Sequence, residues 1–406
     1  MAMKQTQTKL FDFSDVGLDF CVGSKNLFPD RFKKMLSLGY NEQTVSSVAI
    51  AGNQVTLTYG GAHGYAQDRV LKVDSGTLAS INDGEFWIDS VTTNTVTFTL
   101  DDAPTSVASG FTTRIAPLGW ELVYEQANIH VYKFKHIDDT DMFLRLCFQN
   151  TSNRRNHVTP CVGNNYDSET GFITDENSWS SVRGVASPQY IQWEFGGQAT
   201  TIHNDYSYTQ GYSSYGLAKM VGSKYHCVFM TNAFSSTYSG RINGILPIST
   251  LAYEQLNRPL LIAESYQSLT GQGHSNQGVN ALASVGSRRV TFSPYFADSM
   301  LINAPVNTSS GSSFLPNEID ALQTTTAMPI PIYLFNERHQ VGYVAAGLYL
   351  CSYSSSNAPS TAVTASPSLT KDIDLNNDCV LHYLSRGNGS GLQAYFIAPV
   401  EEVKYV

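Results

Sequence analysis

The chain has 406 residues, of which 15% are charged and 12% aromatic, and its net charge is −9. An average soluble protein has about 25% charged residues, so this chain is poor in charge, and its 25 Lys and Arg residues form no basic run. Nucleic-acid binding is therefore not expected, because neutralising phosphates requires clustered cations. Hydrophobic residues make up 42% of the chain and occur along its whole length, which excludes a disordered protein.

Membrane insertion and secretion are not expected either. No run approaches the roughly 18 consecutive apolar residues of a transmembrane helix, and residues 1–15 lack the apolar stretch of a secretion signal. We therefore expect a protein made in the cytoplasm without disulfides. No CxxC pair is present, so the cysteines are predicted to be small buried side chains and not zinc ligands. They are Cys21, Cys147, Cys161, Cys227, Cys351 and Cys379.

Residues 1–42 are predicted to form an arm with one short helix at 29–40. Pro29 and Asp30 are typical of a helix start and Gly39 of a helix end. The arm also carries apolar side chains that it cannot bury by itself. We expect these to pack across a neighbouring subunit or back onto the large domain, and the candidates for such an interface are Phe11, Phe13 and Phe20.

Residues 43–115 are predicted to form a small β module. Segments rich in Val, Ile, Thr and Phe recur here at intervals of about 8–12 residues, separated by turn residues, which is typical of a small barrel or sandwich. The expected strands are 47–52, 54–60 and 69–75, and further strands are expected within 81–91 and 95–100.

Residues 116–406 are predicted to form a larger β-sandwich-like region, either one domain or two subdomains. Alternating or continuously apolar segments predict strands, and a weaker pattern predicts a second helix at 249–256. Two stretches rich in Ser, Thr, Ala and Pro, 305–316 and 353–369, are expected to be exposed loops. The whole chain is therefore predicted to be mainly β with very little helix. The expected strands in this region are 130–136, 142–148, 190–195, 225–230 and 348–353.

Polar clusters fall at positions that resemble turns. The carboxylates of 138–141 lie between two predicted strands, which favours a solvated hairpin tip and leaves a calcium site as the alternative. Residues 337–339 are predicted to be a hairpin turn. The segment 372–378 begins like a calcium-binding loop, but Tyr383 stands where a bidentate Glu is required. His203 and Asp205 are predicted to lie in a turn or loop. No metal ion or cofactor is therefore predicted.

The motifs of common enzyme classes are absent. The sequence has no GxSxG nucleophile turn, no GxxxxGK[ST] phosphate loop, no HExxH and no dinucleotide-binding GxGxxG after a strand. A polysaccharide hydrolase would need paired carboxylates about 5–10 Å apart, and the sequence points to no such pair. The protein is therefore not expected to be an enzyme.

Four tyrosines are concentrated in one polar stretch. Tyrosine rings pack at protein interfaces and stack on sugars, with a hydroxyl left for hydrogen bonding. A protein contact or a packed loop is favoured, and a glycan-binding surface is the alternative. These candidate interface residues are Tyr206, Tyr208, Tyr212 and Tyr215.

The segment 45–103 has a recognisable pattern. It contains AHGYAQDRVLKV at 62–73, NDGEF at 82–86 and IDSVTTNTVTFTLDDAP at 88–104, and it resembles a small β domain that recurs in virion proteins of tailed bacteriophages. The junction APLGWE at 116–121 is similar to a segment of phage structural proteins. The resemblance implies a virion component and brings no enzymatic residue with it.

This resemblance gives the leading functional hypothesis. The chain is expected to be a structural protein of the tail, baseplate or tail tip, assembled in the host cytoplasm, present in the virion as a symmetric homo-oligomer and in contact with other virion proteins. The alternative is a receptor-binding protein that recognises host-surface glycans. The position in the particle, the stoichiometry and the host stay open.

Overall fold

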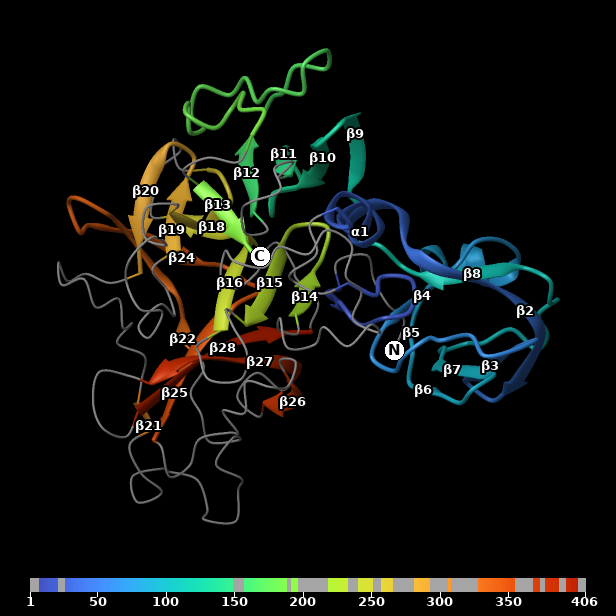
Figure 1. Ribbon diagram of the computed structural model, residues 1–406. Coiled ribbons are helices and arrows are strands. Elements are labelled where there is room, and N and C mark those ends of the chain that lie inside the picture. The colour runs from blue at the N-terminus through green and yellow to red at the C-terminus, as the bar shows by residue number, and fades with distance from the viewer. Residues whose placement is uncertain are drawn as a thin grey trace.

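The computed structural model describes most of the first half of the chain and separate segments of the second half (Figure 1). Among the described residues, strands make up most of the regular structure and helices are few and short, which confirms the prediction of a mainly β protein with very little helix. Within the described segments, no helix is long and apolar enough to cross a membrane. The described residues are 7–20, 26–148, 157–187, 191–195, 218–232, 240–250, 257–265, 281–292, 306–307, 328–354, 368–372, 377–386 and 392–400.

A seven-stranded antiparallel sheet, called the small sheet below, has the order β5-β4-β8-β2-β3-β7-β6. Two 3₁₀ turns, η2 (Thr77–Ser80) and η3 (Asn82–Gly84), connect β4 to β5. The strands are β2 (Tyr40–Ala51), β3 (Gln54–Tyr59), β4 (Val70–Val73), β5 (Glu85–Trp87), β6 (Ser90–Val91), β7 (Thr95–Thr99) and β8 (Thr112–Ile115).

The small sheet folds over itself. The start of β2 pairs with β8 and its later part pairs with β3, and the register shifts after Tyr40 and after Val45. Such irregularities bend a strand. Phe86 of β5 consequently stacks on Phe98 of β7, with ring centroids 4.4 Å apart. The sheet thus encloses its own apolar interior, and the predicted division of the chain into domains stays a prediction.

A fifteen-stranded sheet, called the large sheet, contains the longest path of paired strands and a branch at β18. The main path runs through β9 (Glu121–Gln126), β10 (Ile129–Lys135), β11 (Asp141–Phe148), β12 (His157–Gly163), β13 (Ile191–Glu194), β18 (Leu260–Ser265), β19 (Ala281–Val285), β20 (Arg288–Thr291), β23 (Pro331–Leu334), β24 (Gln340–Val344) and β17 (Ile248–Thr250). The branch runs through β16 (Gly240–Leu246), β15 (Cys227–Asn232), β14 (Ala218–Gly222) and β1 (Lys9–Asp12).

Two sequence predictions in this region have clear outcomes. Residues 337–339 do form the turn of a hairpin, between β23 and β24. The helix predicted at 249–256 is wrong at its start, because Ser249 and Thr250 belong to β17, which pairs with β24. Backbone pairing with a neighbouring strand overrides the weak helical pattern there. Residues 251–256 lie outside the described residues.

A third sheet of six strands lies beside the large sheet (Figure 1). Its β21 and β25 are parallel, and its other neighbours are antiparallel. The strands are β21 (Val306–Asn307), β22 (Met328–Pro329), β25 (Tyr349–Ser354), β26 (Ser368–Asp372), β27 (Asn377–Arg386) and β28 (Leu392–Pro399).

Two large hydrophobic cores lie on opposite faces of β1, β14 and β15. Successive residues of a strand point to opposite faces of the sheet. Phe11 and Phe229 accordingly belong to the first core, which also contains the interior of the small sheet and residues of β10 to β13. Leu10 and Val228 belong to the second core, which also contains Phe396 of the third sheet. These three strands are therefore a wall that is apolar on both faces.

The predicted first helix is shorter than expected and changes its winding. The α-helix α1 (Phe28–Lys33) is followed by a π-helical turn η1 (Lys34–Leu38), in which the Gly39 amide donates to the carbonyl of Lys34 at 2.8 Å. Gly39 has φ +77°, and a Cβ there would lie 2.4 Å from the carbonyl oxygen of Ile115. Only glycine fits this helix end, as the sequence predicts.

The prediction of buried cysteines is confirmed for the four cysteines whose side chains are described, which are Cys147, Cys161, Cys227 and Cys379. Burial raises the pKa of the Cys147 thiol to about 11 and that of Cys161 to about 12. Both thiols are therefore protonated and unreactive at neutral pH.

Two buried histidines are held neutral in the large sheet. His226 is fully buried with its Nδ1 2.9 Å from the Ser223 hydroxyl, and burial lowers its pKa to about 4. His130 lies with its Nδ1 2.9 Å from the Tyr132 hydroxyl. Burial lowers the pKa of His130 to about 4 even though Glu125 acts in the opposite direction.

These histidines predict a loss of stability in mild acid. Both are neutral in the folded state and take up a proton near pH 6.5 in the unfolded state, so their contribution is complete above pH 6.5 and is lost as the pH falls toward 4. Each shift corresponds to about 3 kcal/mol. Urea unfolding at a series of pH values should show the free energy of unfolding falling through this window, and His226→Asn should flatten the slope. A free energy that is constant from pH 6.5 to 4.5 would contradict the assignment.

Candidate functional site

The first part of the chain that the sequence nominated for an interface is the beginning of the predicted arm. Its described residues are 7–20, and the word arm refers to these residues from here on. Its strand β1 pairs with β14, and the Phe13 amide donates to the Ala218 carbonyl at 3.1 Å. The chain then turns back, so that the Phe20 amide donates to the Phe13 carbonyl at 3.1 Å. All four residues of β1 are buried. Of the two placements expected for the arm, the structure shows the packing onto the rest of the same chain.

The three aromatic interface candidates of the arm lie inside the first core, each with no more than 1% of its surface exposed. Phe13 and Phe20 stack with their ring centroids 4.0 Å apart. The ring centroids of Phe11 and Tyr40 are 6.3 Å apart. Phe20 meets Phe28 of α1 edge to face at 5.5 Å. The rings therefore join the arm to the helix within one chain. The next rings in the same cluster are Phe32, Phe148, Trp193, Phe195 and Phe229.

The arm is also tied to the small sheet by a buried ion pair. The Lys9 ammonium lies 2.8 Å from the carboxylate of Glu85 on β5, and it donates a second hydrogen bond to the Pro117 carbonyl at 2.6 Å. Burial lowers the pKa of Lys9, and Glu85 opposes that shift. A buried ammonium is tolerated only with such partners, so Lys9 fixes the position of β1 relative to β5.

A second buried ion pair joins the arm to the segment before β4. Arg69 donates from Nε and Nη2 to the two carboxylate oxygens of Asp15 at 2.8 and 3.0 Å. The Tyr40 hydroxyl donates to the same carboxylate at 2.7 Å. Burial lowers the pKa of Arg69, but Asp15 outweighs this effect and the net shift is upward. The two-point contact fixes orientation as well as distance.

A third ion pair joins the arm to the large sheet. The carboxylate of Asp12 lies 3.3 Å from the ammonium of Lys219 on β14, and both side chains are largely buried. Burial raises the pKa of Asp12, but Lys219 and hydrogen bonds from Ser14 outweigh it, so the net pKa is lowered. Three charged residues of the arm, Lys9, Asp12 and Asp15, are thus paired with residues elsewhere in the chain.

The motif that carries the family resemblance has a packing role. The buried His63 accepts a hydrogen bond at Nδ1 from the Tyr65 amide at 3.0 Å, so its Nε2 carries the proton and donates to the carbonyls of Thr92 and Thr95 at 2.9 and 3.1 Å. The Tyr65 hydroxyl donates to the Thr113 carbonyl at 2.8 Å. These contacts connect the loop after β3 to the β6–β7 turn and to β8.

The junction at 116–121 connects the two larger parts of the chain. The Leu118 amide donates to the Met35 carbonyl, and the Trp120 amide donates to the Leu36 carbonyl, each at 2.9 Å. The buried indole of Trp120 stacks on Phe134 at 4.7 Å and donates to the Ser223 carbonyl at 2.9 Å. The junction is therefore bound to the π-helical turn and to the β14–β15 turn.

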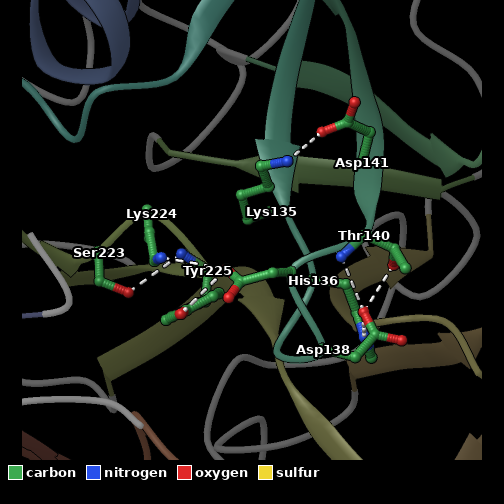
Figure 2. Close-up of polar contacts among 9 residues, drawn as sticks. Lys135, His136, Asp138, Thr140, Asp141, Ser223, Lys224 and Tyr225 are labelled. Atoms are coloured by element: carbon green, nitrogen blue, oxygen red, sulfur yellow. Dashed lines mark hydrogen bonds and ion pairs between the residues drawn. The ribbon is translucent and has the colours of Figure 1, made fainter. Parts of the chain in front are cut away.

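The carboxylates of 138–141 lie at the tip of the β10–β11 hairpin, as the favoured interpretation predicts. Figure 2 shows the side chain and amide of Thr140 pointing at Asp138, with distances of 2.6 and 3.0 Å to Oδ1, and His136 Nδ1 lies 3.2 Å from the same oxygen. Burial raises the pKa of Asp138, but the hydrogen bonds from Thr140 outweigh it and lower the pKa to about 2.

The other two carboxylates of this hairpin tip have cationic partners. Lys224 lies 3.0 Å from Asp139. Lys135 lies 2.6 Å from Asp141, as Figure 2 shows. A calcium ion would have to displace these partners. Within the described residues, no three His, Cys, Asp or Glu side chains come together in a way that could hold a metal ion.

Several residues singled out in the sequence lie outside the described residues. These include His203 and Asp205, and the four tyrosines that were interface candidates: Tyr206, Tyr208, Tyr212 and Tyr215. The ion pairs of the arm were not found from the sequence. Their partners are far apart in the chain, and the only signal was the presence of charged residues between aromatic ones in the arm.

Comparison with known proteins adds no relative: no family model, curated protein or solved structure matches this chain. The likeness to phage virion proteins therefore depends on the residues quoted for it.

The Asp15–Arg69 pair predicts strong coupling between the arm and the small sheet. Asp15→Asn should lower the free energy of unfolding by about 3–5 kcal/mol, because it leaves the buried Arg69 without a counter-charge. The double variant, which also carries Arg69→Met, should lose much less free energy of unfolding than the two single variants lose together. Urea unfolding of the four proteins measures the coupling. Lys33→Gln, which removes a pair with Glu125 at the surface, should have little effect. If the losses of unfolding free energy from Asp15→Asn and Arg69→Met simply add in the double variant, the coupling is contradicted.

Proposed function

We propose that this chain is a structural subunit of a tailed-bacteriophage virion, acting in the tail or its baseplate and tip through contacts with neighbouring subunits. The observation that carries the proposal is the pattern of residues in 62–73, 82–86 and 88–104. It resembles the small β domain of such virion proteins, and the structure gives the same residues positions on which the small sheet depends.

Two parts of that pattern support the proposal. His63 and Tyr65 hold three parts of the small sheet together through the hydrogen bonds described above. Gly84 has φ +70°, and a Cβ there would lie 2.5 Å from the Val73 carbonyl oxygen, so the position requires glycine. Residues that determine a fold are those expected to persist when a domain is reused among virion proteins.

The architecture is also suited to a particle component. A virion protein must keep its shape outside the cell, and long-range pairing within large sheets, with a wall that is apolar on both faces, makes local opening costly. Apolar side chains that remain outside the cores are available for subunit contacts. Among the described residues these include Val16 and Leu38, which are 53% and 52% exposed, and a symmetric homo-oligomer would use such positions repeatedly.

Analysis of purified particles tests the proposal. Virions of the phage that encodes this chain should contain it in multiple copies by quantitative mass spectrometry, and a cryo-electron microscopy map should place the two sheets and the small sheet within the tail. Detection of the chain in the infected-cell lysate together with its absence from purified virions would overturn the proposal.

A further inference from the structure

A groove with a concentration of arginine lies at one end of the large sheet. It is bordered by the loop around Trp179, by the β19–β20 hairpin and by the β23–β24 turn, and it encloses about 540 Å³. This volume is in the range of small-ligand sites, about 300–1,000 Å³. The groove contains both aromatic and charged side chains. Those used below are Trp179, Arg288, Arg289, Phe335, Asn336 and Glu337.

One aromatic ring positions two cations beside the groove. The guanidinium carbon of Arg289 lies 3.6 Å from the centre of the Phe335 ring, and that of Arg338 lies 4.9 Å from the same centre. The Phe335 amide also donates to the Arg289 carbonyl at 3.1 Å. Stacking on the ring restricts both guanidinium groups, so two like charges are held close together before any ligand arrives.

Arg288 and Arg289 are not paired with carboxylates in the way that most other described cations are. Most of the other described Lys and Arg side chains lie against a carboxylate. Arg288 and Arg289 are exposed, and no carboxylate pairs with either of them among the described residues. Burial and the neighbouring Arg338 both lower the pKa of Arg289. An anion bound at Arg289 would relieve this repulsion.

The remaining residues of the groove specify the ligand further. Glu337 only accepts hydrogen bonds when ionised, and Asn336 both donates and accepts, so the ligand must offer donors as well as an anionic group. The strands that border the groove, β19, β20 and β23, are each paired on both sides. A peptide therefore finds no free strand edge to extend. A sugar acid has a carboxylate, neighbouring hydroxyls and an apolar ring face that suits Trp179.

We propose that this groove binds a carboxylate-bearing sugar of an acidic polysaccharide. Arg289 binds the carboxylate through its paired N–H groups, Arg288 adds positive potential, and Glu337 and Asn336 bind the hydroxyls. The proposal does not depend on the structural role proposed above, because the binding can be measured on the isolated protein.

Calorimetric titration with a uronic-acid trisaccharide and with 3′-sialyllactose tests this proposal, with lactose as the neutral probe. At least one acidic probe should bind, and lactose should not. Arg289→Gln should weaken binding about tenfold or more. Arg289→Lys should recover only part of the loss, because an ammonium lacks the flat, forked donor set. Lys133→Gln removes a cation whose partner is Asp141, and it should leave binding unchanged.

Three outcomes would overturn the proposal. The first is the absence of binding to both acidic probes by a wild-type protein whose urea unfolding is normal. The second is binding that is equal in wild type and in folded Arg289→Gln. The third is binding of inorganic phosphate or poly-glutamate as tight as that of the sugars, which would make the groove a general anion site.

Discussion

Strand β1 is buried on both faces, and the arrangement of the three sheets depends on this constraint. Lys9–Asp12 alternate between the two cores, so that Phe11 lies with the small sheet and the helix while Leu10 lies with the third sheet. The Thr8 hydroxyl, one residue earlier, donates to the carbonyl of Pro399, the last residue of β28 in the third sheet, at 3.2 Å. A segment near the start of the chain thus contacts the small, large and third sheets together. This central position means that both cores are completed by the arm.

The low charge content takes on a structural meaning in this arrangement. Lys9, Asp12 and Asp15 are brought out of water, where an unpaired charge is very costly, and each has a partner on another element. Such pairs contribute little net stability compared with apolar residues of the same volume, but breaking one is expensive. They therefore select one placement of the arm over others. The arginine groove departs from this pattern, since Arg288 and Arg289 are exposed and have no carboxylate partner among the described residues, and that departure is one reason for assigning it a ligand.

Much of the fold could be predicted from the sequence, and the exceptions have physical causes. Strands such as β3, β7, β10 and β11 were predicted because alternating or apolar runs match the period of a sheet. The arm strand was not predicted, because a strand with two buried faces has no alternation to detect. The end of the helix was predicted from Gly39, whereas the carbonyls of its π-helical turn accept hydrogen bonds from Leu118 and Trp120, far along the chain, which no local pattern reveals. For the candidate site, the burial requirement of Phe11 and Phe13 was visible in sequence. The choice between a neighbouring subunit and the same chain was not, because it depends on partners such as Glu85 and Arg69 that no local pattern connects to the arm.

The proposed virion role and the arm-centred fold are consistent with each other, because a particle component benefits from sheets that cannot separate locally. The most direct test of the central claim is native-state hydrogen exchange at the amides of β1. If the arm completes both cores, the amides of Leu10 to Phe13 should exchange as slowly as those of β14 and β15, since they can open only when the wall between the cores opens. Exchange of the β1 amides at rates close to those of an unfolded peptide, while β14 and β15 stay protected, would contradict the account.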